Sequence, residues 1–351
     1  MKTENISLST NEKLGLLSNL STMLSAGMPL LETVDAILED SKGNQKKLLD
    51  ILRADLIQGK HIYYTFSKFP NIFSKVTTNI IKAAEEAGTL DVTLKDVKEN
   101  MKKEMEFTDR VKSSLIYPIF VVGVFLLVFV MILVVVVPKI SSVFLRLKVD
   151  LPLPTQIMIF MSNAIINYTI PVIVSLAFLF FVSVFLYRKQ KKMILNLFFQ
   201  LPLISDLARD MDLTAFSRSF HLLLNAGIPI VSALELAEDV AVKKEVREGI
   251  RHAKEAVIGG RRISQGFRDK KGIFPAILIR ITEAGEKTGS LDKSMLEISE
   301  FLDYQVSGRL KTIVSLLEPI MLVVIGGLIG GMMMAIIAPI YGLIGQVGAA
   351  R

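Results

Sequence analysis

Leu24-Ser25-Ala26-Gly27-Met28-Pro29-Leu30 is the stretch that decides the fold, because it returns as Leu224-Asn225-Ala226-Gly227-Ile228-Pro229-Ile230. Further along, Gly88-Thr89-Leu90-Asp91 returns as Gly289-Ser290-Leu291-Asp292. The offset between matching residues is 200 at the first pair and 201 at the second. An offset held over so long a stretch indicates duplication. The 351-residue chain is therefore predicted to contain two copies of one module.

Each quoted turn is predicted to join two antiparallel helices. Residues 12–25 carry leucines at helical spacing, and Ala26-Gly27 then ends the helix, since glycine accepts the left-handed conformation required there. Pro29 suits the first turn of the next helix. Copy two repeats this arrangement around Gly227 and Pro229.

The rest of each module is also predicted to be helical, and no stretch alternates as a strand would. A short helix is expected around Phe66 and around Phe267. The longer helices are expected at 45–57 and 73–87 in copy one, and at 242–258 and 274–288 in copy two. The last helix of copy one has no break after Leu90 and should run directly into the apolar segment that follows. Each module is therefore predicted to be a bundle of six helices.

Three apolar runs are long enough to cross a bilayer core of about 30 Å. They are residues 113–138, 157–187 and 312–338, which are expected to form transmembrane helices 1, 2 and 3. Glu318 is the one acidic residue in the third run. The predicted fold class is thus an all-α membrane protein with two homologous six-helix modules and three transmembrane helices.

The basic residues predict the orientation in the membrane. They gather before run one, after run two and before run three, whereas the loop 139–156 and the tail 339–351 carry few. Because basic segments stay in the cytoplasm, modules 1–112 and 188–311 are expected there, with the loop and the C-terminus outside. The polar segment Met1–Asn11 predicts no cleavable signal peptide.

Composition argues against enzyme chemistry. The chain has no cysteine and three scattered histidines, so thiolate metal sites and redox chemistry are excluded, and no cofactor is expected. Gly285-Glu286-Lys287-Thr288 lacks the glycine-rich loop of a nucleotide site. The net charge of +7 comes largely from copy two, where the Arg188–Lys192 cluster indicates a membrane anchor and not a nucleic-acid site.

Equivalent glutamates, Glu85 and Glu286, lie near a helix end in each copy. One hypothesis gives them a contact with an ATPase or a cation. The other, which we favour, is that the carboxylates bond nearby backbone or a basic side chain and fix the helix junction. The basic pair Arg261 and Arg262 could attract an acidic partner, although a solvated loop is the commoner outcome.

The third apolar run carries two further candidates. Glu318 could meet the free amine of an incoming subunit, or it could snorkel to the headgroups or pair with another helix. Copy one has Tyr117 there, so the repeat fold does not need the charge. Four glycines form overlapping GxxxG patterns, which predict a helix-packing face within the chain or between protomers: Gly326, Gly327, Gly330 and Gly331.

Over nearly its whole length the sequence resembles the type II secretion F protein family, the PilC-like and GspF-like platform proteins. The resemblance rests on the paired Ala-Gly-x-Pro turns, the segment Gly285–Leu291, Leu151-Pro152-Leu153-Pro154-Thr155, Leu201-Pro202-Leu203-Ile204 and Glu318-Pro319. Copy one departs from the family at Ala84-Glu85, where Gly-Glu is frequent, and Ser205 replaces a common glycine.

The resemblance implies an inner-membrane platform that performs no chemistry itself. It implies as partners a hexameric cytoplasmic ATPase, pilin or pseudopilin subunits, other inner-membrane assembly proteins and a second copy of the chain, in a dimer or higher oligomer. Without the resemblance, a duplicated membrane unit also fits a small-solute transporter. Runs one and two lack charge and the number of spans is odd, which argues against a transporter.

Overall fold

The protein is all-helical in the part that the computed structural model describes, namely residues 6–147, 153–168, 171 and 202–349. No strand occurs among these residues, and one isolated bridge joins Lys271 to Phe274. The predicted all-α class is therefore confirmed. Two compact units are present: Met1–Arg110 with Ser205–Arg309, and Val111–Ile204 with Leu310–Arg351. Both sequence repeats thus fold into the first unit.

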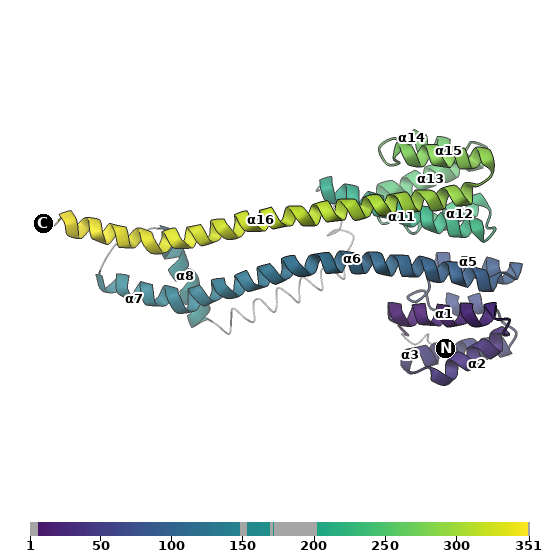
Figure 1. Ribbon diagram of the computed structural model, residues 1–351, viewed down its shortest axis with the longest axis horizontal. Coiled ribbons are helices and arrows are strands. Elements are labelled where there is room, and N and C mark those ends of the chain that lie inside the picture. Colours follow the sequence, from purple (N-terminus) through teal and green to yellow (C-terminus); the bar gives the residue numbers. More distant parts are fainter. Residues whose placement is uncertain (1–5, 148–152, 169–170, 172–201, 350–351) are drawn as a thin grey trace. The chain divides into compact units, whose positions relative to one another are not determined.

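The two copies give matching series of helices (Figure 1). Expected helix ends agree with the observed ends to within two residues. Copy one forms α1 (Thr10–Ser25), α2 (Leu30–Asp40), α3 (Gly43–Ile57), α4 (Ile62–Ser67), α5 (Lys75–Ala87) and α6 (Leu90–Met131). Copy two forms α11 (Pro202–Asn225), α12 (Ile230–Glu238), α13 (Lys244–Ile258), α14 (Ile263–Asp269), α15 (Ala276–Thr288) and α16 (Leu291–Ala349).

The decisive turn has the same geometry in both copies. Gly27 and Gly227 have φ values of 82° and 76°, in the left-handed region that glycine alone enters without cost. The N–H of Met28 then bonds the carbonyl of Met23 at 3.1 Å, closing the end of α1. Pro29 lies at the N-cap of α2, one position earlier than predicted.

The first unit has one hydrophobic core, to which both copies contribute. In copy one the ring of Phe66 stacks on that of Phe73, with centroids 3.8 Å apart. The equivalent rings of Phe267 and Phe274 are 4.3 Å apart and tilted. Because α4 and α14 are too short to be stable alone, these aromatic contacts hold them in place.

The last helix of each copy is long and unbroken. Helix α6 has 42 residues and continues through Pro118, and α16 has 59 residues. The prediction that the last helix of copy one continues past residue 113 is confirmed. After α6 come a π-helical turn, η1 (Ile132–Val136), and α7 (Val137–Leu147), so part of the expected loop 139–156 is helical. A uniformly aliphatic sequence such as Ile132–Val136 carries no signal that distinguishes a π-turn from α-helix.

The second unit has a small core of its own, which Met332 and Ala335 share with Leu133, Val137 and Met158. Helix α8 (Leu153–Asn167) contributes two hydroxyl donors to this core. Thr155 Oγ1 donates to the carbonyl of Ala335 at 2.5 Å, and Ser162 Oγ to that of Leu133 at 2.6 Å. Hydroxyl bonds of this kind hold apolar helices together.

Two of the predicted spans appear in the described residues. The segments Leu90–Ser142 and Leu291–Ile337 are long and apolar enough to cross a membrane, judged by length and composition. For the predicted span 157–187, the structure describes the residues up to 168 and residue 171. The rest of that span and the Arg188–Lys192 cluster lie outside the described residues.

Candidate functional site

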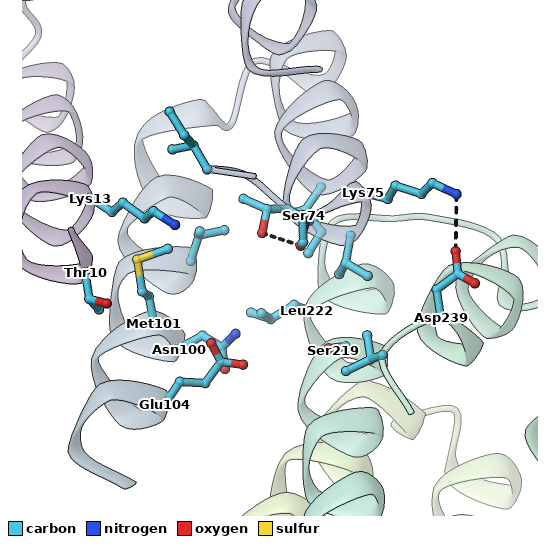
Figure 2. A pocket seen from close by; sticks show the side chains of 16 residues that line it. Thr10, Lys13, Ser74, Lys75, Asn100, Met101, Glu104, Ser219, Leu222 and Asp239 are labelled. Carbon is cyan, nitrogen blue, oxygen red and sulfur yellow. Dashed lines mark hydrogen bonds and ion pairs between the residues drawn. The ribbon is translucent and has the colours of Figure 1, made fainter. Parts of the chain in front are cut away.

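A groove of about 560 Å³ lies in the first unit, between side chains of copy one and copy two (Figure 2). Copy one forms most of it, through the start of α1, the start of α5 and one face of α6. Copy two adds the middle of α11 and the residues after α12. The lining residues include Lys13, Lys75, Asn100, Met101, Glu104, Ser219, Leu222 and Asp239.

The wall of this groove is apolar in part. Five of its aliphatic side chains are at least nine-tenths buried, and they also belong to the core of the unit: Ile72, Val76, Ile80, Val97 and Leu222. Met101 and Val240 are half-buried beside them. The groove is therefore a continuation of the core that is open to solvent, which is the usual construction of a binding site.

Two oxygen acceptors meet at one end of the groove. Asn100 and Glu104 are four residues apart on α6, so they share a helix face, and Figure 2 shows them next to each other. The Asn100 Oδ1 atom is buried and has no hydrogen-bond partner. Glu104 is exposed by surface area but closely surrounded by protein, and this desolvation raises the pKa of its carboxyl despite the nearby positive charge of Arg218.

Lysines line the other sides of the groove. Lys13 Nζ donates to the carbonyl of Asn71 at 3.4 Å. Lys75 Nζ lies 3.4 Å from the carboxylate of Asp239 in copy two, and both side chains are exposed, so the pair contributes little stability. Figure 2 shows Lys13 on one side of the groove and the Lys75–Asp239 pair on the other.

Charged side chains also join the copies beyond the groove. The carboxylate of Asp303 on α16 lies 3.4 Å from the guanidinium of Arg218 and 3.8 Å from that of Arg110 on α6. Lys103 reaches Glu300 at 3.2 Å. The Arg218 side chain is only 10% exposed, so its pairing with Asp303 avoids the cost of an unpaired buried charge.

The predicted glutamates bind the starts of short helices. Glu85 accepts hydrogen bonds from the N–H groups of Ile62 (3.0 Å) and Tyr63 (3.4 Å). Glu286 accepts them from Ile263 (2.5 Å) and Ser264 (3.2 Å). Both oxygens of each carboxylate are therefore in use at the N-terminus of α4 or α14, where negative charge is favoured. Among the residues described, no three His, Asp or Glu side chains are grouped to hold a metal ion.

The basic pair of copy two has one member in an ion pair. Arg261 Nη2 lies 2.8 Å from the Asp269 carboxylate, which also lies 3.1 Å from the ring of His252. Arg262 is exposed at the N-cap of α14. The Arg262 side chain therefore lies at the surface, whereas the Arg261 side chain is held by its ion pair with Asp269 at the end of α14.

In copy one, a different set of charged residues stabilises the matching junction between α3 and α4. Its acid is the buried Asp55, which lies 3.0 Å from Lys60 Nζ, 2.5 Å from Lys68 Nζ and 2.8 Å from Thr65 Oγ1. In copy two the matching residues are Ala256, Arg261, Asp269 and Gly266. A Cβ on Gly266 would lie 3.2 Å from the Cβ of Ala256, so the two small residues allow α13 and α14 to pack closely.

The glycine face lies on α16 in the second unit. Gly326, Gly327, Gly330 and Gly331 are all exposed, and a Cβ added to any of them meets nothing within 4 Å in the described structure. Farther along α16, Met332 and Ala335 are buried in the core of the second unit. The described structure therefore shows no packing within the chain for this face. Glu318 is likewise exposed on α16.

The groove could not be identified from the sequence. Asn100 and Glu104 look like ordinary polar residues of a surface helix, and their role appears only when α1, α5 and α11 are placed around them. The sequence does carry one indication of a buried face here. Val97 and Met101 are four residues apart, as Asn100 and Glu104 are, and this apolar pair interrupts a charged stretch. Copy two has Phe301 and Gln305 at the matching positions, so these acceptors belong to copy one alone.

Comparison with known proteins gives matches across the whole chain. PilC, a type IV pilus assembly protein of Pseudomonas aeruginosa, is 27% identical over 333 residues, which are 94% of this chain and 89% of PilC. The PilC of Thermus thermophilus is 29% identical over 330 residues, covering 93% and 81%. Type II secretion system protein F of Vibrio cholerae is 24% identical over 329 residues, covering 92% and 80%.

The family model described as type II secretion system (T2SS), protein F matches the chain twice, at residues 16–138 and 216–339. These two ranges coincide with the repeats and with the apolar helix that follows each of them. The matches cover more than half of the chain. The chain therefore belongs to the type II secretion system protein F family.

Proposed function

We propose that this protein is an inner-membrane platform of a type IV pilus or type II secretion machine, and that it couples a cytoplasmic assembly ATPase to polymerisation of pilin or pseudopilin subunits. The names of its relatives, which are pilus assembly proteins and secretion proteins, support the machine. The observation that carries the coupling is the continuity of α6 and α16, which extend from the duplicated unit into apolar segments.

Such helices act as stiff connections. At 1.5 Å per residue, the 42 residues of α6 extend about 63 Å and the 59 residues of α16 about 88 Å. A displacement applied to the cytoplasmic end of a continuous helix reaches its apolar end without being absorbed by a flexible linker. The ATPase therefore needs to contact only the cytoplasmic helices in order to move the part of the protein that meets the subunits.

The proposed topology places residues 1–112 and 188–311 in the cytoplasm and the C-terminus outside, with spans at 113–138, 157–187 and 312–338. The difference in charge between the two copies supports the proposal that they contact different partners. Residues 1–114 hold 16 basic and 16 acidic side chains, whereas residues 187–312 hold 21 basic and 16 acidic. We assign the exposed Arg262, with Arg261 beside it, to the contact with an acidic surface of the ATPase.

The apolar part of α16 supplies the contact between protomers in this proposal. The glycine face allows a second helix to approach closely, and it is unoccupied in the described chain. Glu318 lies at the cytoplasmic end of the same segment and is proposed to pair with a neighbouring helix or with headgroups. In this proposal the protein forms a dimer or a higher oligomer through this face.

The coupling is tested by interrupting α6 outside both the groove and the apolar segment. In a deletion strain, wild-type protein and Glu106→Ala should restore fibres or secretion, because Glu106 is exposed and only distantly paired with Lys102. Glu106→Pro should insert normally and still copurify with the ATPase but fail to restore fibres, because proline breaks the helix interior. Normal fibre formation by the proline variant would contradict coupling through α6, and normal fibres in the deletion strain would contradict the platform function.

A further inference from the structure

We infer that the groove between the two copies binds a segment of a partner protein in which one lysine or arginine is flanked by apolar side chains. This inference goes beyond the proposed function, since it concerns the chemistry of a binding site and does not depend on which protein supplies the segment.

Asn100 lines the groove, and its amide oxygen lacks a partner. The Oδ1 atom is buried and receives no hydrogen bond. A buried acceptor without a donor is unfavourable, because the water that it lost on folding has not been replaced. A rotation of the half-buried Asn100 side chain that turns this oxygen into the groove would let a donor from a partner remove the deficit, so the site favours occupants that bring an N–H group.

The Glu104 carboxylate at the groove has no paired cation among the described residues. No hydrogen bond or ion pair reaches its carboxylate from the part of the chain that the structure describes. The nearest guanidinium, that of Arg218, is paired with Asp303 at 3.4 Å. The Glu104 side chain is exposed at the groove, and the protein atoms around its carboxyl raise its pKa. A cation delivered to this position would stabilise the charged carboxylate.

Together, the Asn100 oxygen and the Glu104 carboxylate determine which side-chain head group binds best. They lie one helical turn apart, within reach of one ammonium with three donors or one guanidinium with five. A neutral donor could serve Asn100 but would leave the Glu104 charge without compensation. The site therefore discriminates for lysine or arginine over serine or glutamine.

The groove also has room for apolar side chains. A volume of about 560 Å³ exceeds what one side chain fills, and it lies in the usual range for pockets that hold peptide-sized or drug-sized ligands. The half-buried Met101 and Val240 offer surface both to the methylene stem of a long basic side chain and to its apolar neighbours in sequence.

Charge on the sides of the groove limits the occupant to a single basic residue. Lys13 would repel a second cation placed near it, whereas the charge of Lys75 is offset by that of Asp239. A polybasic segment is therefore disfavoured, and an apolar segment with an isolated basic residue fits best. The opposite choice, an acidic segment bound through the two lysines, would place negative charge close to Glu104.

The test uses the full-length protein in detergent and a short, fluorescently labelled, amidated peptide with a central lysine flanked by leucine and isoleucine. Matched peptides carry norleucine or glutamate in place of the lysine. The lysine peptide should bind at least about tenfold more tightly than either, because the norleucine and glutamate peptides lose the hydrogen bonds that the charged ammonium group donates. Glu104→Gln and Asn100→Leu should remove most of this preference.

Glu99→Gln serves as the matched control. Glu99 lies on the same helix, pairs with Lys98 at 3.3 Å and does not line the groove, so this variant should bind like wild type. Asn100→Leu also separates binding from folding, because removing an unpaired buried oxygen should leave the melting temperature unchanged or raised. The inference is overturned if no peptide binds saturably, if lysine and norleucine peptides bind equally, if the glutamate peptide binds best, or if Glu104→Gln and Asn100→Leu both bind as wild type does.

Discussion

Glu286 on α15 accepts a hydrogen bond from the backbone N–H of Ile263, the first residue of α14, at 2.5 Å. The start of a helix leaves N–H groups without partners, and α14 has only seven residues in which to recover that loss. The glutamate supplies the missing acceptor from the next helix in the chain. Glu85 and Ile62 repeat the relationship in copy one at 3.0 Å.

Replacing this glutamate should loosen α14 specifically. Glu286→Ala leaves the N–H groups of Ile263 and Ser264 unpaired and should destabilise the first unit by about 2 kcal/mol. Amide hydrogen exchange should quicken at both residues in the full-length protein. Glu283→Ala, which removes surface ion pairs with Arg268 and Lys287, is the control and should have a smaller effect on α14. Unchanged exchange at Ile263 would contradict the capping role.

Gly285 should not tolerate a methyl group, although copy one has Ala84 there. A Cβ on Gly285 would overlap the side chain of Ser294, coming within 2.7 Å of its Cβ. Gly285→Ala should therefore destabilise the protein by about 1–3 kcal/mol, measured by thermal unfolding. Gly15→Ala meets open space on α1 and should be neutral or slightly stabilising. A Gly285→Ala protein as stable as Gly15→Ala would contradict the packing.

The Asp55 cluster should make stability fall in acid. Burial acts to raise the pKa of Asp55, but hydrogen bonds from Lys68, Lys60 and Thr65 outweigh it and lower the pKa below 3.8. A carboxyl whose pKa is lowered by folding stabilises the protein above the unfolded value, and this contribution is lost as the pH falls through the folded pKa. The loss should therefore occur below pH 3.8.

Asp55→Asn provides the comparison for that pH dependence. It should cost about 3 kcal/mol at neutral pH, because Lys60 and Lys68 lose a buried partner. Its unfolding free energy should also fall less steeply than that of wild type when the pH drops below 3.8. Parallel pH profiles for the two proteins would show that Asp55 is not the responsible group.

The glycine face is expected to mediate self-association. Gly327→Leu with Gly331→Leu should weaken oligomers without impairing folding, since both positions are exposed and a Cβ at either has no atom of the described chain within 4 Å. Because the protein has no cysteine, Gly326→Cys alone gives a clean disulfide-crosslinking assay. Ile329→Leu, which is exposed on α16 outside the row formed by Gly327 and Gly331, is the control. Undiminished crosslinking in the double leucine variant would argue against this face.

Local signals in the sequence were enough to predict the repeated helices. Paired glycines such as Gly88 and Gly289 adopt left-handed φ values of 71° and 73°, as a helix stop requires, and they can be recognised without knowledge of tertiary structure. Which leucines of α1 are buried could be predicted less well from their spacing. Leu16 is fully buried whereas Leu14 is partly exposed, because neighbouring helices decide which edge of a broad apolar stripe is covered.

The groove and the cross-copy ion pairs could not be predicted in this way. Lys103 and Glu300 are 197 residues apart, and nothing local marks either of them as a partner. Similarly, the unpaired state of Asn100 Oδ1 depends on which atoms fail to reach it, which only the packed structure defines. Sequence periodicity reports the environment of a helix face, but not the identity of the side chains opposite.

The different charge arrangements at Asp55 and Asp269 have a consequence for the history of the gene. Duplicated sequences can be homogenised by recombination, which copies part of one repeat over the other. A crossover between positions 57 and 64 would join Asp55 to the glycine and aspartate of copy two in place of Thr65 and Lys68, leaving a buried carboxylate near a second acid. Such hybrids would fold poorly, so selection would remove them. The two repeats are therefore insulated from each other and free to diverge toward different partners.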